Sequence, residues 1–166
     1  MGVANSIWRF LSDPRGAAAV EMALLTPVLV VLLSGMADLG KLAFDDVRLT
    51  AAARTGAQYG VDWAVLNGLT DYTGADTAVT NGVATAMPTG TSAKMSGQSH
   101  YLYCICVPND GSGQGAATSC GGSCASGQTL DTYVGVTVSE RATVPITLFN
   151  LGSSQVLTGQ AILRVN

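Results

Sequence analysis

The sequence predicts an α+β fold in which a long N-terminal helix, transmembrane at first and then amphipathic, packs on a small antiparallel sheet. Three patterns predict it. An apolar, almost uncharged run covers residues 17–37, apolar residues then recur at three- and four-residue spacing up to residue 60, and segments with a period of two follow from residue 101. The first pattern is typical of a membrane span, the second of an amphipathic helix and the third of half-buried strands.

The apolar run is long enough to cross a membrane. At about 1.5 Å per residue, residues 17–37 span about 30 Å, the thickness of a bilayer's hydrocarbon core. The leader at residues 1–16 has a side-chain charge of +1, with Arg9 and Arg15 against Asp13, and the remaining chain has −4. Because short basic flanks stay in the cytoplasm, we expect the N-terminus inside and the acidic body outside the inner membrane. The sequence lacks a clustered basic face, so the charge pattern argues against a nucleic-acid partner.

The helical pattern continues beyond the apolar run. Five apolar residues keep the helical spacing: Leu39, Leu42, Ala43, Val47 and Ala51. Three charged residues close enough to pair lie on another face: Lys41, Asp45 and Arg48. We therefore predict one helix of about 40 residues, whose amphipathic half covers residues 38–60 and ends at Gly60. The spacing of Gly56 and Gly60 also fits the small-residue pattern of close helix contact, which is the alternative to a helix end and turn.

Residues 61–166 are predicted to form one small, disulfide-stapled α+β domain outside the membrane. A second helix is expected over residues 76–87, where apolar residues recur at a spacing of four and Pro88 follows. The recurring apolar residues are Val79, Val83 and Met87.

Alternating apolar residues in the same domain predict four strands. The strands are expected at residues 101–107, 133–139, 144–148 and 157–165. In the first of them Leu102 shares one face with two cysteines, because side chains alternate along a strand. The stretches at residues 89–98 and 108–130 are rich in glycine and serine and are predicted to be loops.

The four cysteines lie close together in the part predicted to be outside: Cys104, Cys106, Cys120 and Cys124. An even, clustered set in an exported domain is typical of two disulfides, which here would pin a loop too poor in apolar residues to form its own core. Three connectivities are possible, and the nested one, Cys106–Cys120 with Cys104–Cys124, is geometrically the easiest. A Cys104–Cys106 bond would be strained in an extended strand. Zinc is the alternative, but the spacings are not the usual ones for zinc, so we expect no metal and no cofactor.

Catalytic motifs are missing from the sequence, and we expect no enzymatic activity. His100 is the only histidine, so a Ser-His-Asp or Cys-His site would rest entirely on it, and a surface or structural role fits it better. Neither the HExxH pattern nor a glycine-rich phosphate loop occurs. Asp71, Asp76 and Asp110 carry oxygens suited to calcium, but no ligand loop surrounds them.

Glu21 is the residue with the clearest functional meaning. A carboxylate costs about 2–3 kcal/mol at the centre of a bilayer, so acids in membrane helices usually mark function, although near the interface snorkelling is the alternative. Arg15 and Gly16 end the leader. A cut after Gly16 would give Ala17 a new α-amino group, and Glu21, then the fifth residue, would neutralise it or the amine of a neighbouring helix. We therefore predict a processing site at Gly16 and Ala17 and a charge-pairing role in assembly for Glu21.

Three segments, at residues 16–27, 38–40 and 51–60, together resemble one family. They are similar to the TadE-like proteins, which are pseudopilins or minor pilins of the tight-adherence (Flp, type IVb) pilus system, and residues 101–165 are more loosely similar. The resemblance implies a pilin-like fold, cleavage after Gly16 by a prepilin peptidase, and contacts of the N-terminal helix with other pilins and the pilus assembly platform. It also implies a single-pass protein of the inner membrane that can be incorporated in a pilus. Pro27 fits the family pattern and can kink or soften the helix.

Two other interpretations remain open. Residues 1–37 resemble a conventional signal peptide with small residues before a cut near Ala37, which would release an exported soluble binding protein. Against it, the leader is long, the apolar run contains Glu21 and the helical pattern passes Ala37. The other interpretation is a membrane-anchored periplasmic protein that is never cleaved.

Overall fold

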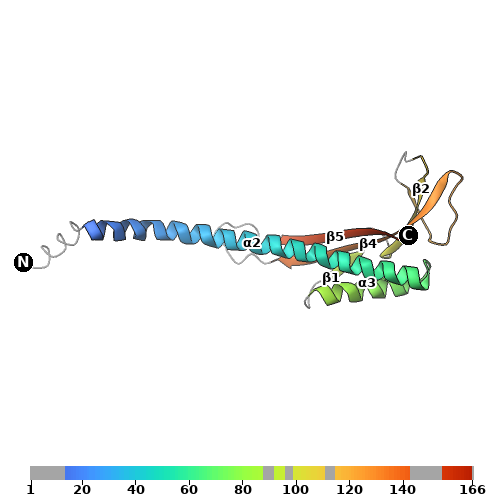
Figure 1. Ribbon diagram of the computed structural model, residues 1–166, viewed down its shortest axis with the longest axis horizontal. Helices are drawn as coiled ribbons and strands as arrows, with labels where there is room; N and C mark the ends of the chain where they lie inside the picture. The colour runs from blue at the N-terminus through green and yellow to red at the C-terminus, as the bar shows by residue number, and fades with distance from the viewer. Residues whose placement is uncertain (1–13, 88–91, 96–98, 111–114, 143–154, 166) are drawn as a thin grey trace, which may run out of the picture. The chain divides into compact units, whose positions relative to one another are not determined.

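The computed structural model describes residues 14–87, 92–95, 99–110, 115–142 and 155–165 (Figure 1). Its elements are the helices α2 (Pro14–Asn67) and α3 (Tyr72–Ala86) and the strands β1 (Ser92–Met95), β2 (Leu102–Pro108), β3 (Ala116–Thr118), β4 (Gln128–Ala142) and β5 (Gln155–Val165). The contacts divide the chain into two compact units, and α2 contributes to both, with its first part up to Lys41 in one and the part from Leu42 in the other. The predicted α+β class, a long N-terminal helix and a small antiparallel sheet, is confirmed.

Helix α2 is longer than the sequence predicted. It has 54 residues and continues beyond Gly60, so the predicted helix end at Gly60 is wrong. The helix ends at Asn67, and Gly68 follows with φ 99°, a left-handed conformation that glycine adopts without steric cost. The N–H of Gly68 donates to the carbonyl of Ala64 at 3.1 Å and so closes the last turn.

The glycines inside α2 serve close packing instead. A Cβ at Gly60 would lie 2.7 Å from a methyl of Val79 on α3 and 2.8 Å from a methyl of Val134 on β4. A Cβ at Gly56 would lie 2.5 Å from a methyl of Val83. The close-contact interpretation of this pair is therefore the correct one, and the neighbours are α3 and the sheet.

Helix α3 begins at Tyr72, earlier than the predicted start near residue 76, because Asp71 caps it. The Asp71 carboxylate accepts hydrogen bonds from the N–H of Gly74 and from Nε1 of Trp63, both at 3.0 Å. The first bond satisfies a donor that the helix itself leaves free, and the second ties the cap to α2. The predicted apolar face is confirmed: Val79, Val83 and Met87 are buried.

Within the described residues, five antiparallel strands form the sheet, in the order β1-β4-β2-β3 with β5 beside β4. Strand β4 is central. It pairs with β5 through residues 132–142, and its opposite edge pairs first with β2 through residues 128–134 and then with β1 through residues 136–139. One long strand therefore joins three partners (Figure 1).

Three of the four predicted strands correspond to β2, β4 and β5, and the fourth, at residues 144–148, lies outside the described residues. The two predicted loops were partly wrong. Strand β1 lies within residues 89–98, while β3 and the start of β4 lie within residues 108–130. These short segments carry no alternation of their own, and pairing with β4 or β2 makes them strands.

The core lies between the second part of α2, α3 and one face of the sheet. Alternate residues of the central strands are buried in it, as predicted: Leu102, Cys104, Val134, Val136 and Val138. From α2 the core receives mostly small residues: Leu49, Ala52, Ala53, Ala57 and Ala64. Gly159 of β5 lies directly against the α2 backbone at Leu49, where a Cβ would collide, so helix and sheet are in very close contact.

Candidate functional site

The predicted processing junction lies at the start of α2. The helix begins at Pro14, so the backbone at Arg15, Gly16 and Ala17 is already helical. Proline suits the first helical position, since its missing N–H has no partner there in any helix and its φ is fixed near the helical value. The bond after Gly16 therefore lies in the first turn, where backbone N–H groups lack intrahelical acceptors.

Glu21 stands on an exposed apolar helix. Its neighbours Val20, Met22 and Leu24 are 54, 64 and 72% exposed. None of the ion pairs among the described residues includes Glu21. The carboxylate thus lies one helical turn beyond Ala17, on a surface that nothing in the described part of the chain neutralises or covers.

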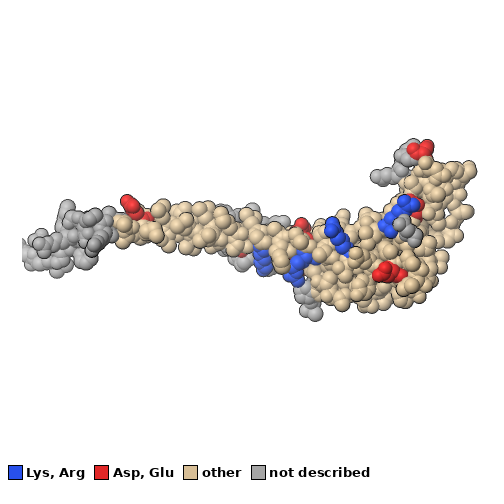
Figure 2. All heavy atoms as spheres, in the orientation of Figure 1, with Lys and Arg blue, Asp and Glu red and all other residues tan. Residues whose placement is uncertain are grey.

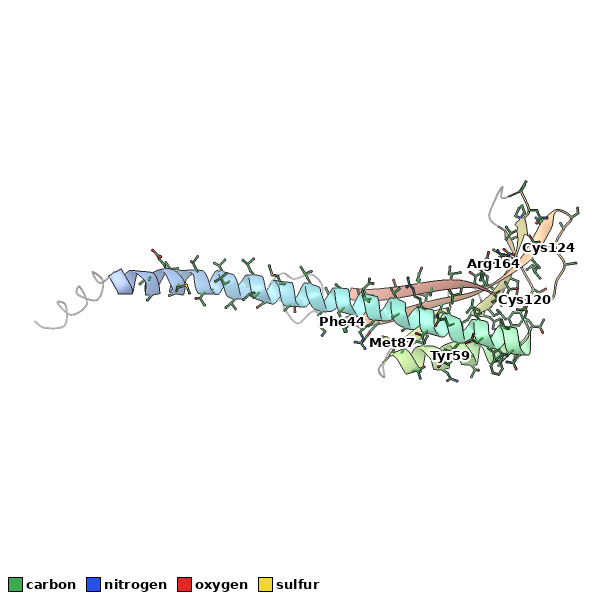
Figure 3. All side chains as sticks on the ribbon, viewed as in Figure 1. Phe44, Tyr59, Met87, Cys120, Cys124 and Arg164 are labelled. Carbon is green, nitrogen blue, oxygen red and sulfur yellow. A yellow bond between two sulfur atoms is a disulfide. The ribbon has the colours of Figure 1, made fainter. Side chains whose placement is uncertain are left out.

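The first part of α2 has the length and composition of a membrane span. An 18-residue window reaches a mean hydropathy of 2.0 and is 0% buried, which is compatible with a single-pass membrane protein. Figure 3 shows its side chains projecting on all sides of the helix. Large apolar side chains are exposed along it: Leu25, Val28, Leu29, Val30, Leu32, Leu33 and Met36. Such a helix is unstable in water and needs an apolar cover.

Pro27 interrupts the hydrogen bonding of this span. It lies inside α2 and has no N–H, so the carbonyl of Ala23 loses its usual donor. The hydroxyl of Thr26 next to it donates to the carbonyl of Met22 at 2.6 Å, and Ser34 donates to the carbonyl of Val30 at 2.7 Å. Such local bonds keep hydroxyl groups satisfied where water is missing, and they often accompany bending of helices.

Charged residues return in the later part of α2, as Figure 2 shows on one face of the molecule. The predicted pairing of Asp45 with Arg48 is present at 3.6 Å, whereas the ion pairs of the described residues do not include Lys41. The Arg48 guanidinium also lies 5.7 Å from the centre of the Phe44 ring. This polar stretch follows the apolar one directly, as expected for a helix that leaves a bilayer.

Two disulfides are formed, as predicted, but they do not have the nested pairing that was geometrically the easiest of the three possible ones. The structure joins Cys104 to Cys120 and Cys106 to Cys124, with Cα–Cα distances of 5.1 and 5.6 Å. The register of β2 with β3 decides this, because it places Thr118 opposite Cys104. Cys120 lies only two residues after Thr118, so it is the cysteine that comes next to Cys104.

A turn completes the second bond. The N–H of Gly122 donates to the carbonyl of Ser119 at 2.9 Å, and the chain reverses there. The reversal returns Cys124 to Cys106. Sequence spacing alone could not reveal this turn, because its effect depends on the strand register before it.

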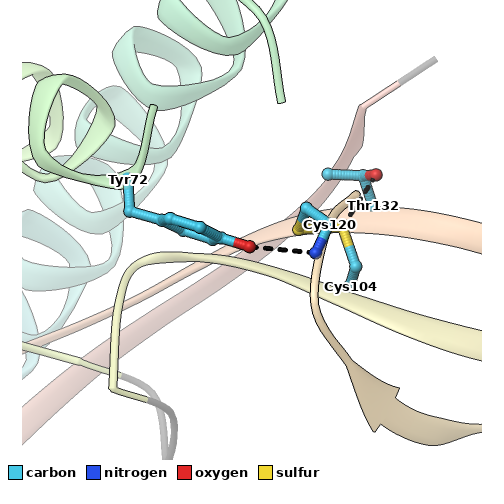
Figure 4. The surroundings of a disulfide bond; sticks show 4 residues. All are labelled: Tyr72, Cys104, Cys120 and Thr132. Carbon is cyan, nitrogen blue, oxygen red and sulfur yellow. Dashed lines mark hydrogen bonds between the residues drawn. A yellow bond between two sulfur atoms is a disulfide. The ribbon is translucent and has the colours of Figure 1, made fainter. Parts of the chain in front are cut away.

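Further contacts hold the Cys104–Cys120 bond in the core (Figure 4). The Tyr72 hydroxyl accepts a hydrogen bond from the N–H of Cys120 at 2.9 Å, and Cys104 Sγ lies 3.1 Å from Thr132 Oγ1. Cys104 is 0% exposed, while Cys124 is only half-buried. The first disulfide thus fastens the segment after β3 to β2, and the Tyr72 hydrogen bond ties that segment to α3. The second disulfide fastens the surface loop.

The remaining polar candidates have structural contacts. His100 Nδ1 lies 2.7 Å from Asp76 Oδ2, and its ring stacks on Tyr72 at 5.0 Å. The second oxygen of Asp76 accepts the N–H of Tyr101 at 2.9 Å. With Asp71 engaged as a helix cap, two of the three aspartates considered for calcium have other roles, and within the described residues no three potential ligands gather.

A second polar cluster, on the outer face of the sheet, was not predicted. Arg164 donates to Asp131 at 2.7 Å, Tyr133 donates to the same carboxylate at 3.2 Å, and the Tyr133 ring stacks on Tyr103 at 5.9 Å. Burial raises the pKa of Tyr103, with the neighbouring Tyr133 as a second cause. Only the pairing of β4 with β2 and β5 brings these residues together, so no signal along the sequence could have shown the cluster.

Comparison with known families identifies a match for the first part of the chain. Residues 16–58 match the model of the family described as TadE-like protein, which confirms the resemblance inferred from the sequence. The match begins at Gly16 and covers the exposed apolar part of α2 together with most of its packed part. Comparison with curated proteins and with solved structures found no match.

Proposed function

We propose that this chain is a TadE-like pseudopilin or minor pilin, which a prepilin peptidase cleaves after Gly16 and which takes part in assembling a tight-adherence type IVb pilus. One observation carries the proposal. The apolar first part of α2, whose most apolar 18-residue window is 0% buried, bears a single carboxylate, Glu21, at the fifth position after Gly16, and the family match begins at that glycine. The role is structural, and no catalysis is proposed.

Charge pairing supports the role of Glu21. Cleavage after Gly16 gives Ala17 a protonated amine at neutral pH. Residues 17 and 21 are four apart, so in a helix their Cβ atoms lie about 5–6 Å from each other. In a low-dielectric surrounding an opposite charge at this range offsets much of the cost of burying the carboxylate. The partner amine is that of the same chain or that of a neighbouring pilin.

The exposed apolar surface of α2 supports the proposed membrane and pilin partners. Lipid covers it before assembly, with the N-terminus in the cytoplasm and the domain from residue 38 outside the inner membrane. Apolar helices of other pilins replace the lipid in a pilus. Since one apolar cover replaces another, transfer of the helix from lipid to the pilus changes the hydrophobic free energy little. Helix packing and the pairing of the Glu21 charge then determine the free energy of this transfer.

The N-terminus of the mature protein tests the proposal most directly. We expect N-terminal sequencing of the purified protein to begin at Ala17. A start at Asp38 would instead favour the exported soluble binding protein with a signal peptide, and an intact Met1 the uncleaved anchor. Gly16→Ala should block processing, and Gly35→Ala, in the same helix with nothing within 4 Å of a Cβ, is the matched control.

Assembly is tested separately from processing. Glu21→Gln keeps the shape of the side chain and removes its charge, so it should be cleaved normally but enter sheared pili poorly. An immunoblot that compares the sheared fraction with the membrane fraction measures this. Normal processing of the Gly16 variant, or full incorporation of the Glu21 variant, would contradict the corresponding part of the proposal.

A further inference from the structure

The two disulfides are interlaced along the chain. Of the four cysteines, the first pairs with the third and the second with the fourth, at sequence separations of 16 and 18 residues. Cys120 and Cys124 are the third and fourth cysteines of the chain and belong to different bonds. Only Gly121, Gly122 and Ser123 lie between them. Neither native bond therefore joins two cysteines that follow each other along the chain.

An unfolded chain favours a different first bond. The probability of closing a flexible loop falls as about the −3/2 power of its length, so a separation of 4 is favoured over one of 16 by about eightfold. Two glycines between Cys120 and Cys124 keep this short loop flexible. The nested pairing, with separations of 14 and 20, is entropically almost equivalent to the native one. Loop closure thus selects the wrong bond first and does not distinguish the native pair from the nested one.

Only the folded sheet selects the native bonds. The β2–β3 register brings Cys120 to Cys104, and the turn at Gly122 returns Cys124 to Cys106. The bond between Cys104 and Cys120 is then enclosed. Cys104 has no exposed surface, so the folded core encloses its sulfur and restricts its access to another disulfide. A Cys104 thiol that folds before oxidation is therefore slow to attack a Cys120–Cys124 bond.

We propose that this chain is a substrate of a thiol–disulfide isomerase of the export compartment, in addition to a disulfide oxidase. The isomerase thiolate attacks Cys120 of the non-native bond, forms a mixed disulfide with that sulfur and releases Cys124 as a thiolate. Cys104 then joins Cys120, and the isomerase thiolate leaves, without net oxidation. Joining Cys106 to Cys124 removes two electrons and two protons, which the oxidase accepts on its own disulfide.

Oxidative refolding of the full chain in detergent micelles tests this inference. Reduced, unfolded protein is diluted into either the thiol oxidant diamide alone or a mixture of reduced and oxidised glutathione, and free thiols are alkylated at intervals. A protease that cleaves before aspartate cuts at Asp110 and Asp131, which separates Cys104 and Cys106 from Cys120 and Cys124. Native and nested bonds both hold the two peptides together, whereas consecutive bonds leave them apart, and mass spectrometry distinguishes linked from separate peptides.

With diamide alone, the Cys120–Cys124 bond should exceed any single long-range bond by about eightfold among the first products. Glutathione, and more rapidly an added dithiol isomerase, should convert it to linked peptides. The double variant Cys106→Ser, Cys124→Ser can form only the Cys104–Cys120 bond and should gain nothing from either addition. Equal yields of linked peptides with and without glutathione would overturn the proposal, as would the same thiol dependence in the double variant.

This inference rests on the export of the outer domain, which is part of the proposed function, but not on any role in pilus assembly. The two therefore fail separately. A mature start at Ala17 together with thiol-independent refolding removes only the isomerase, and a start at Met1 together with thiol-dependent refolding removes only the cleavage.

Discussion

Replacing Gly60 by alanine is expected to destabilise the compact unit that contains the sheet, although alanine favours helices. An alanine in place of glycine in a helix gains about 1 kcal/mol. At Gly60 the new methyl would lie 2.7 Å from Val79 and 2.8 Å from Val134, and both neighbours are branched side chains with little freedom to turn away. Overpacking of this kind costs about 1–3 kcal/mol, so the net loss is about 0–2 kcal/mol.

Gly40 of the same helix provides the matched control. Nothing lies within 4 Å of a Cβ built there, so Gly40→Ala should keep the full helical gain. The two variants are then expected to differ in unfolding free energy by about 1–3 kcal/mol, because propensity cancels and only the packing remains. The comparison needs no absolute value for either variant.

Urea unfolding of the full chain in a mild detergent measures this difference. In a Trp8→Phe background Trp63, which is bonded to Asp71 beside the core, is the only tryptophan and reports on the packed unit. Val79→Ala removes the nearer methyl, so it should cost less in the Gly60→Ala background than alone. Equal stability of the Gly60 and Gly40 variants, or additivity with Val79→Ala, would refute the described packing.

Three further predictions concern the cap, the disulfides and alkaline pH. Asp71→Ala should lower the unfolding free energy by about 1–2 kcal/mol and shift Trp63 emission, while Asp71→Asn, which can still cap, should lose less. Replacing either cysteine pair by alanines should cost about 3 kcal/mol in urea unfolding, and the Cys104–Cys120 pair should cost more, since the loops are similar and only this bond is fully enclosed. Burial and the nearby Asp76 raise the pKa of Tyr101 above its unfolded value of 10.0, so stability should be complete below pH 10 and fall above it, and Tyr101→Phe should reduce this fall in an unfolding series from pH 8 to 11.

Local periodicity was enough to predict the main elements. Apolar residues at helical spacing continue through most of α2, and alternation predicts strands at β2, β4 and β5. In β4 and β5 the alternating apolar residues are also the more buried ones. These signals are strong because each residue's exposure depends on its own position in a regular element. They hold wherever the element is long enough to repeat the pattern.

The helix end shows how a local signal can mislead. A glycine predicts a C-cap when the helical pattern stops beside it, but the pattern after Gly60 continues through Trp63 and Ala64. The dipeptide Asn67-Gly68 was the stronger stop signal, because its glycine is followed by a turn. What Gly60 provides is space for Val79 and Val134, and that requirement comes from elements far along the chain.

The disulfide pairing and the short strands lay beyond sequence reasoning for the same reason. Which cysteine meets Cys104 depends on the β2–β3 register, and β3 itself has only three residues, too few to show a period. Strand β1, with four residues, is likewise set by its partner β4. Where strand register determines which cysteines or strands pair, no local sequence motif near the paired residues predicts the pairing.

The distribution of large and small apolar residues along α2 separates the two purposes of this helix. Its buried face is made mostly of alanine and glycine, since Gly159 and the Val79–Val134 contacts leave no room for larger groups. The large apolar residues of the same helix, such as Phe44 and Val47 at 62 and 66% exposure, point elsewhere. Hydropathy alone would assign these large residues to the core. Because the described residues do not cover them, they form an apolar surface on the packed part of α2, which suits contact with a neighbouring helix.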